Sequence, residues 1–525
     1  MAAESNRPKG LSVFHALIQQ ISGPVSMYYL KPKDDAYEAY RKEGITLPLV
    51  LLFGDRHYSR EGACQPCTEP TCTTLTGRPW IHVLEGLGTV YPIDFFTETA
   101  PFMERIGQQH RADTGFLFHD FFKKFFMDCR DPSKRNAIDS TCPTGTIRWH
   151  HADARFMPST AEGYLYGPLF NQLYTVLQFR SKFTNHLPLL PLERMYHVKS
   201  TNHPKAREYY VQTNEWLKSQ FPAWLKEPTM TSFILRAMKD ILVHLQTTHR
   251  TKRESAIFKQ LDGMKGSSLE NISFWMTLLS TYLERNPPRR ADTFFTMIQD
   301  EALKENVIRY LQAIPILDAP PPYSVYPPTR GVDATTLYQA LEEFVKEVWM
   351  PSMQYLLDIY TLLRMVKPPR NALPGMLTIG FFGNAHATFM AHALYTMGYT
   401  VVSSTSVKEQ PRCQTVAQRI PLAEDLQAQL VKRLRTSEEV EAYTAYQKWA
   451  QERIAHRDAR IRYTLSQKGV SPASPASPPS PALKRKANTM NRKNNQGRNN
   501  NQGRKNNNQN NRTKKSKTHK GGRRG

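Results

Sequence analysis

The sequence predicts an α/β fold in which a mostly parallel sheet is split by a large helical insertion. Two apolar runs, at 47–53 and 376–383, each end at a glycine, as strands buried on both faces often do. The second run is followed by a helical stretch at 385–397 and a β-rich run at 399–407, the strand–helix–strand order of a parallel sheet. From about 160 to 370, apolar residues recur at helical spacing. We therefore expect strands before and after the helices to share one sheet.

The first half of that sheet is expected from runs near the N-terminus. Residues 10–42 are interpreted as mixed helix and loop leading into the strand at 47–53. VYPIDFFTE at 90–98 is rich in residues that favour strands. TIRWHHADAR at 146–155 carries polar groups at alternate positions, which indicates a third strand or strand end.

The helical region is long and is interrupted by prolines. Its periodic runs predict helices over 164–183, 209–225, 230–248, 269–285, 291–313 and 334–366. The resulting organisation is 1–158 for the first part of the α/β core, 159–370 for the helical insertion, 371–420 for the second part of the core, 421–465 for a C-terminal helical segment and 466–525 for a tail. The tail is Pro/Ser-rich and then Asn/Lys/Arg-rich, so it cannot bury enough apolar surface to offset chain entropy and we expect disorder.

Charge is distributed unevenly along the 525 residues. The formal net charge is +24, and fifteen Lys or Arg with no Asp or Glu lie between Lys484 and Gly525. No apolar run reaches the roughly 20 residues of a membrane-spanning helix, and no secretory signal pattern is present. We expect a soluble intracellular protein without a membrane partner, whose six cysteines need not form disulfides.

A candidate site lies where the predicted strands end. Gly-Asp-Arg-His at 54–57 and Gly-Asn-Ala-His at 383–386 both follow an apolar run, and Glu98 ends the run between them. Because ligands of open α/β sheets bind beyond the carboxyl ends of strands, Asp55, His57, Glu98 and His386 are expected at one rim. They could hold Zn²⁺, Mn²⁺ or Co²⁺ and activate a water, or a His–Glu pair could act as general base without metal. The alternative is a polar sheet rim without chemistry.

A second polar group follows the third strand. Arg148 and Arg155 could clamp a phosphate or carboxylate bidentately, with His150 beside them. Asp153 could orient a histidine of the site. Together they are candidate substrate-binding residues. The alternative is an Arg–Asp pair that fixes the end of the strand.

Cysteines form a third candidate. Cys64 and Cys67 have the C-x-x-C spacing that can share a structural Zn²⁺, with Cys72, Cys142 or a histidine as a further ligand. A disulfide and free thiols remain alternatives. The chain contains no Walker A loop, GxGxxG, GxSxG or HExxH motif, which argues against ATPase, dinucleotide-binding and serine-esterase functions.

The tail is a candidate nucleic-acid-binding arm. Its short basic clusters lie among Asn, Gln and Gly and comprise Lys484, Arg485, Lys486, Lys514, Lys515, Arg523 and Arg524. Such clusters displace counterions from phosphates, giving nonspecific, salt-sensitive affinity, and no aromatic residue follows Tyr463 for base stacking. The first cluster could also act as a nuclear localisation signal. The alternative is a tail that only adds solubility.

The motifs of the first third of the chain resemble a family of proteins of unknown function from the giant viruses, the nucleocytoplasmic large DNA viruses. That family has a GDxH strand end, nearby cysteines, a DFxxE strand and an HxxDxR element. The matching positions here are Gly54, Asp55, His57, Cys64, Cys67, Asp94, Phe95, Glu98, His150, Asp153 and Arg155. The resemblance implies a viral protein located in the host cytoplasm, the nucleus or the virion.

A more distant resemblance links His57, Glu98 and His386 to the erythromycin esterase, ChaN and TraB-like superfamily. Its members place His and Glu at strand ends of an α/β core, and some are metal-dependent hydrolases. This chain has Asp55 where that superfamily often has Glu, and its helical insertion is far larger. The resemblance implies a hydrolase-like protein of a kind that depends on a metal in some members. The alternative is a non-catalytic virion or replication-associated protein that binds nucleic acid through its tail.

Overall fold

The fold is seen in a computed structural model of the chain. It describes residues 20–22, 25–55, 73–74, 84, 86–98, 146–156, 160–166, 204–248, 255–264, 266–288, 292–313, 331–367, 373–406, 413–415 and 421–467. All of them belong to one compact unit, Met1–Lys468.

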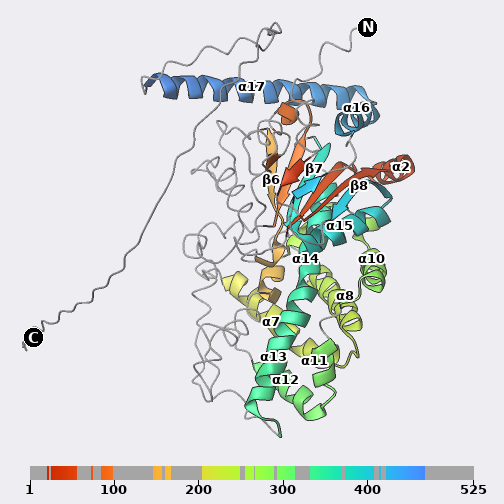
Figure 1. Ribbon diagram of the computed structural model, residues 1–525, viewed down its shortest axis with the longest axis vertical. Coiled ribbons are helices and arrows are strands. Elements are labelled where there is room, and N and C mark those ends of the chain that lie inside the picture. The colour runs from red at the N-terminus through yellow and green to blue at the C-terminus, as the bar shows by residue number, and fades with distance from the viewer. Residues whose placement is uncertain are drawn as a thin grey trace, which may run out of the picture. The chain divides into compact units, whose positions relative to one another are not determined.

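A six-stranded mixed sheet forms the centre of this unit (Figure 1). Its strands are β2 (Ser26–Pro32), β3 (Leu49–Asp55), β5 (Ile93–Thr97), β6 (Ile147–His151), β7 (Leu377–Gly383) and β8 (Tyr399–Ser406). Their spatial order is β6-β5-β7-β3-β2-β8, and β2 runs antiparallel to both of its neighbours while β6, β5, β7 and β3 are parallel. The expected α/β class with a mostly parallel sheet is confirmed.

Strands that precede the helical region in the sequence, such as β3 and β5, lie beside strands that follow it, such as β7. β7 lies between β3 and β5, in register with both: Asp55 pairs with Gly383, and Thr97 pairs with Phe381. β3 is apolar along its length because both of its faces are covered. Val50 and Leu52 join the core on one face, whereas Leu51 and Phe53 join the core on the other.

Every described element between β6 and β7 is helical. These are α7 (Pro204–Trp224), α8 (Met230–Thr248), α9 (Ala256–Leu261), α10 (Ile272–Arg285), α11 (Asp292–Met297), α12 (Glu301–Ala313), α13 (Ala334–Glu343), α14 (Met350–Val366), the π-helical η8 (Phe344–Trp349) and the short 3-10 turns η2 (Ala154–Phe156), η5 (Asp262–Met264) and η6 (Ser268–Glu270). α14 is buried on almost all sides, which explains its continuous apolar sequence. α15 (Asn384–Thr396) packs on one face of the sheet, α10 and α14 pack against α15, and the other helices extend this core away from the sheet (Figure 1).

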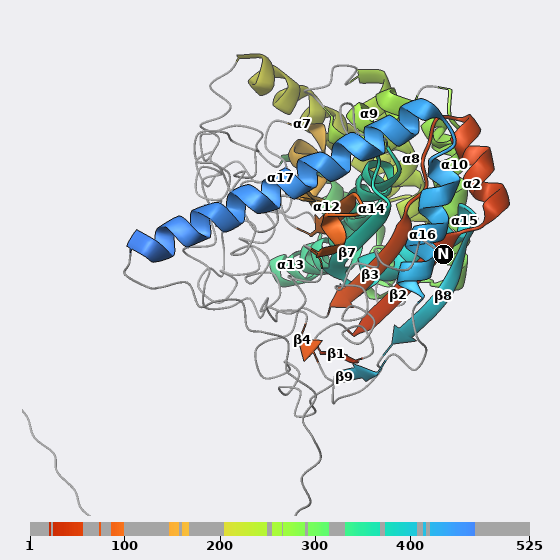
Figure 2. The same cartoon turned by 90° about the horizontal axis from the view of Figure 1, so that it is seen from above.

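The opposite face is covered by the C-terminal helices. Leu422 and Leu426 of α16 (Leu422–Arg433) pack on the sheet, and α17 (Ser437–Gln467) follows. Tyr443 and Tyr446 of α17 donate hydrogen bonds to backbone carbonyls in the segment before β5. Figure 2 shows α17 crossing this part of the fold and a small separate sheet of β1 (Gln20–Ser22), β4 (Thr73–Thr74) and β9 (Cys413–Thr415).

One part of the sequence interpretation is wrong. Residues 10–42 were expected to be helix and loop, but Ser26–Pro32 is the antiparallel strand β2, followed by helix α2 (Asp34–Lys42). The sequence SMYYLKP lacks the long apolar run of β3 and β7. It forms a strand because β3 and β8 pair with it on both sides, and because its tyrosines find hydrogen-bond partners: Tyr28 with Thr388 and Tyr29 with Asp425.

Candidate functional site: an Asp–His–Glu chain at the strand ends

Polar side chains meet where β5 and β7 end, on the face covered by α14 and α15. We call them the Glu98 cluster: Glu98, Asp153, Arg155, Asp358 and His386. Glu98 directly follows β5, and His386 is the third residue of α15, which begins directly after β7. Because the two strands are parallel neighbours, their carboxyl ends bring these residues together.

His386 lies between two carboxylates. Its Nδ1 is 2.7 Å from Asp358 Oδ1, and its Nε2 is 3.3 Å from Glu98 Oε1. Carboxylates only accept hydrogen bonds, so both ring nitrogens act as donors and the imidazole is doubly protonated. Burial alone would lower the pKa of His386, but attraction to Asp358 and Glu98 outweighs it and raises this pKa to about 10. His386 is therefore a cation at neutral pH.

Glu98 is held on both of its oxygens. Its Oε2 accepts a 2.8 Å hydrogen bond from the backbone N–H of Gly383, and Arg155 Nη2 lies 3.4 Å from Oε1. The acid thus lies at the N-terminal end of α15, where the helix dipole favours a negative charge. Its side chain is 16% exposed, against 10% for Arg155, 8% for His386 and 0% for Asp358. Glu98 is the member of the cluster that solvent reaches most readily.

Arg155 connects Glu98 to the turn after β6. Its guanidinium forms two 2.9 Å hydrogen bonds with the oxygens of Asp153, and it lies over the ring of Tyr166. Burial opposes the charge of Arg155, yet Asp153 and Glu98 raise the pKa of this guanidinium. The contact with Asp153 therefore holds the guanidinium of Arg155 in place beside Glu98.

Asp358 is the most deeply buried of the three residues that His386 links, Asp358, His386 and Glu98. Burial raises the pKa of its carboxyl, against the lowering effect of His386. Its Oδ2 has no hydrogen-bond partner among the described residues. The charged form of Asp358 is therefore stabilised mainly by His386. Asp358 is not among the residues predicted for the site, although a single acid inside the apolar run of α14 needs a partner when buried.

The start of α15, which carries His386, lies very close to the backbones of β2 and β3. A Cβ atom at Gly54, near the end of β3, would lie 2.2 Å from Ser26 Oγ and 2.9 Å from Asn384 Oδ1. Ser26 in turn donates a 2.5 Å hydrogen bond to Asn384, the first residue of α15. Glycine is thus required at position 54 for β2, β3 and the start of α15 to meet.

Two of the predicted substrate-binding residues belong to a different group, which we call the Asp94 cluster: Asp94, Arg148, His150 and Arg364. Arg148 binds both oxygens of Asp94 at 2.7 Å, and His150 Nε2 lies 2.6 Å from Asp94 Oδ1. Asp94 precedes Glu98 by four residues, or about 13 Å of extended strand. Arg148 and His150 are therefore separated from Asp153 and Arg155, which lie in the Glu98 cluster.

The pKa of the histidine is lowered in the Asp94 cluster, whereas it is raised in the Glu98 cluster. Burial would raise the pKa of Asp94, but Arg148 and His150 hold it at about 2. Burial lowers the pKa of His150; Asp94 opposes this, but burial together with the cations of Arg364 and Arg148 outweighs it, so the pKa lies below its usual value. Arg364 Nη2 lies 3.0 Å from His150 Nδ1, so Arg364 donates and the neutral ring donates its Nε2–H to Asp94. His150 also stacks on Phe96, with ring centroids 4.5 Å apart.

Several predicted residues cannot be placed in these clusters. Only the backbone of Asp55 is described, and His57 lies outside the described residues. The cysteines Cys64, Cys67 and Cys72 and the basic tail residues also lie outside them. Within the described ranges, no group of three or more His, Cys, Asp or Glu could hold a metal ion.

Comparison with protein-family models, with curated proteins and with solved structures gave no match. Among the helices that the structure describes, none combines the length and apolar character that a membrane span requires.

Proposed function

We propose that this chain is a hydrolase-like enzyme whose acid–base pair is Glu98 and His386. The observation that carries the proposal is the Asp358–His386–Glu98 chain, with contacts of 2.7 Å and 3.3 Å, at the carboxyl ends of neighbouring parallel strands. This is the end of an α/β sheet at which ligands bind. A buried histidine between two acids also has the strongly perturbed pKa that is common among catalytic groups.

The pair would work by exchanging protons. Glu98, the most exposed acid of the cluster, takes a proton from water as the water oxygen attacks an acyl or phosphoryl centre. Loss of the negative charge on Glu98 lowers the pKa of His386, because one of its two carboxylate neighbours becomes neutral. His386 then passes its Nε2 proton to the leaving group. Transfer of the proton from Glu98 back to His386 restores the starting state.

The other residues of the Glu98 cluster would position this pair. Asp358 fixes the imidazole through Nδ1, so that Nε2 faces Glu98. Arg155 and the Gly383 N–H hold the Glu98 carboxylate in place. Both nitrogens of His386 are engaged by acids, which favours proton transfer over metal ligation for this side chain.

Activity against hydrolysable substrates tests the proposal. The full chain should hydrolyse at least one of a panel of 4-nitrophenyl esters and phosphoesters. Glu98→Gln and His386→Asn should lower the rate by roughly 100-fold or more, the usual range for general acid–base groups. Matched controls are His392→Asn, on the same helix, and the exposed Glu284→Gln, which should stay within about twofold. No turnover of any substrate, or full activity of Glu98→Gln, would contradict the proposal.

A metal-dependent version of this hydrolase would use Asp55 and His57 together with Glu98 and His386. Metal analysis of the purified chain separates the two versions. A stoichiometric Zn²⁺, Mn²⁺ or Co²⁺ that is lost in the His57→Ala, His386→Ala double variant would support the metal-dependent version. A metal-free chain that keeps full activity would support the acid–base version.

We also propose that the tail contacts nucleic acid, whether or not the body is an enzyme. The supporting observation is its charge, with fifteen Lys or Arg and no acidic residue between Lys484 and Gly525. Contacts of this kind are made with phosphates and carry little sequence preference.

A further inference from the structure

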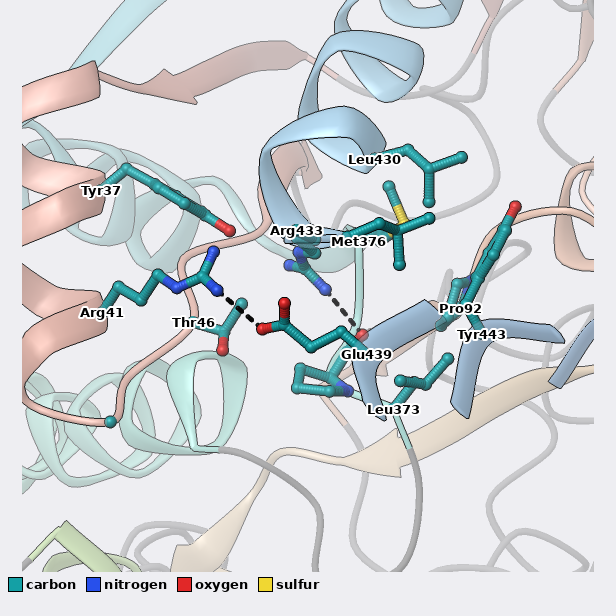
Figure 3. A pocket seen from close by; sticks show the side chains of 13 residues that line it. Tyr37, Arg41, Thr46, Pro92, Leu373, Met376, Leu430, Arg433, Glu439 and Tyr443 are labelled. Carbon is teal, nitrogen blue, oxygen red and sulfur yellow. Dashed lines mark hydrogen bonds and ion pairs between the residues drawn. The ribbon is translucent and has the colours of Figure 1, made fainter. Parts of the chain in front are cut away.

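A cavity of about 270 Å³ lies at the opposite end of the sheet from Glu98. It is lined by Pro92, which precedes β5, and by Met376, which precedes β7, so it lies at the amino ends of these strands. Helix α2, helix α16 and the first turns of α17 complete the wall (Figure 3). The cavity shares no residue with the Glu98 cluster.

The cavity wall contains one arginine that forms an ion pair, Arg41, and one that forms none among the described residues, Arg433. Arg41 is paired with Glu439 at 2.7 Å, and Glu439 also accepts hydrogen bonds from the backbone N–H groups of Arg435 and Thr436. Arg433 instead donates to the carbonyl oxygens of Pro374, at 2.9 Å, and Gly375, at 2.6 Å. Within the described part of the chain, Arg433 forms no ion pair, and its charge is only partly stabilised, by a hydrogen bond to Tyr37 and by the more distant Asp94.

Arg433 retains capacity for a ligand. A guanidinium has five N–H groups, and the carbonyl contacts use only part of them. Its Nε is buried and has no hydrogen-bond partner among the described residues. Burial lowers the pKa of Arg433, but a guanidinium remains charged at any physiological pH. In Figure 3 the hydroxyl of Tyr37 is directed toward the guanidinium of Arg433, which donates a hydrogen bond to its oxygen, and the Tyr37 O–H can in turn donate to a ligand.

The remaining lining residues are mostly apolar and favour a ligand with an apolar chain or ring. Met376, Leu430, Leu434 and Leu373 form much of the wall, with Pro92 and Pro374. Sites for drug-sized molecules usually enclose about 300–1,000 Å³, so this cavity suits a smaller molecule. Among the lining residues, Arg41 is paired with Glu439, which leaves the positive charge of Arg433 to match one negative charge of a ligand. A phosphate monoester carries about −1.5 to −2 at pH 7, so part of its charge would remain unbalanced.

We propose that this cavity binds a small carboxylate with a short apolar chain or ring. The carboxylate lies against Arg433, which offers the planar donor geometry that matches it. The apolar part packs against Leu430 and Met376. Because α2, the sheet and α16–α17 all contribute walls, the occupied cavity connects the C-terminal helices to the core, so binding raises the thermal midpoint of the chain.

Calorimetric titration of the full chain with three probes tests the charge requirement. Benzoate should bind saturably, its uncharged analogue benzamide at least tenfold more weakly, and phenyl phosphate more weakly than benzoate. Equal binding of benzoate and benzamide, or no saturable benzoate binding at millimolar concentration, would overturn the proposal.

Two variants test the location. Leu430→Trp fills the cavity without changing its charge and should weaken benzoate binding at least tenfold. Arg433→Met should abolish the preference for benzoate over benzamide. Arg435→Gln, an exposed arginine two residues further along, should bind benzoate as the unaltered chain does. Unchanged binding by folded Leu430→Trp would place the ligand elsewhere and refute the site. Because the cavity and the Glu98 cluster are at opposite ends of the strands, failure here leaves the hydrolase proposal unaffected.

Discussion

Replacing Asp358 by Asn should destabilise the fold in a pH-dependent way. The substitution keeps the shape of the side chain but removes the charge that lies 2.7 Å from His386 Nδ1. Neutralising one partner of a buried ion pair costs about 3–5 kcal/mol. We expect a value near 3 kcal/mol, because Glu98 still faces His386 and because Asp358, which is 0% exposed, no longer has to be buried as a charge.

The pH dependence follows from the raised pKa of His386. A histidine whose folded-state pKa is about 10 stabilises the fold fully below its unfolded value of 6.5, and this contribution is lost as the pH rises from 6.5 to 10. At 1.36 kcal/mol per pH unit, the contribution is at most about 5 kcal/mol, shared between Asp358 and Glu98. The deficit of Asp358→Asn should therefore be largest at pH 6 and shrink toward pH 10.

Urea unfolding followed by tryptophan fluorescence at pH 6, 8 and 9.5 measures this difference. Asp292→Asn is the matched control, because Asp292 is exposed in the first turn of α11. It should differ from the unaltered chain by less than about 0.5 kcal/mol at every pH. A deficit of Asp358→Asn below about 1 kcal/mol at pH 6, or one that does not change with pH, would refute the reasoning.

Three further predictions concern other parts of the chain. Gly375→Ala should lower the free energy of unfolding by about 1–3 kcal/mol in urea, because the new Cβ would lie 2.1 Å from Asp94 Oδ2; Gly86→Ala, with nothing within 4 Å, should cause no loss. Glu162→Gln should cost about 1–2 kcal/mol in the same assay, because this acid accepts hydrogen bonds from Ser255 and from two N–H groups at the start of α9; an unchanged midpoint would contradict that capping role. Truncation after residue 468 should abolish DNA and RNA binding that weakens steeply with salt in filter-binding assays, and binding that survives truncation would exclude the tail as its source.

Strands with strong local signals were predictable from the sequence. β3 and β7 are predominantly apolar and end near glycine, and β5 is rich in strand-forming residues, so the sequence indicated their positions directly. Because parallel neighbours end at the same edge, the meeting of Glu98 and His386 also followed from the sequence. Their catalytic roles remain a proposal.

Features that depend on tertiary packing were not predictable. Asp358 reaches His386 from a helix of the insertion, and no local pattern indicates which strand end α14 approaches. The alternating positions of TIRWHHADAR suggested one substrate-binding group. However, β6 ends at His151 and a 3-10 turn follows, so the alternation stops before Asp153 and Arg155. The turn sends that pair to Glu98, while Arg148 stays with Asp94.

The protonation state of His386 tests the central claim most directly. In the full chain labelled at histidine, the imidazole signals of His386, assigned by their loss in His386→Asn, can be followed by NMR from pH 5 to 10.5. The Asp358–His386–Glu98 chain predicts that the ring stays protonated past pH 8, and that Glu98→Gln lowers its midpoint by at least one pH unit. A ring that is neutral at pH 7, or a midpoint that Glu98→Gln does not change, would contradict the account.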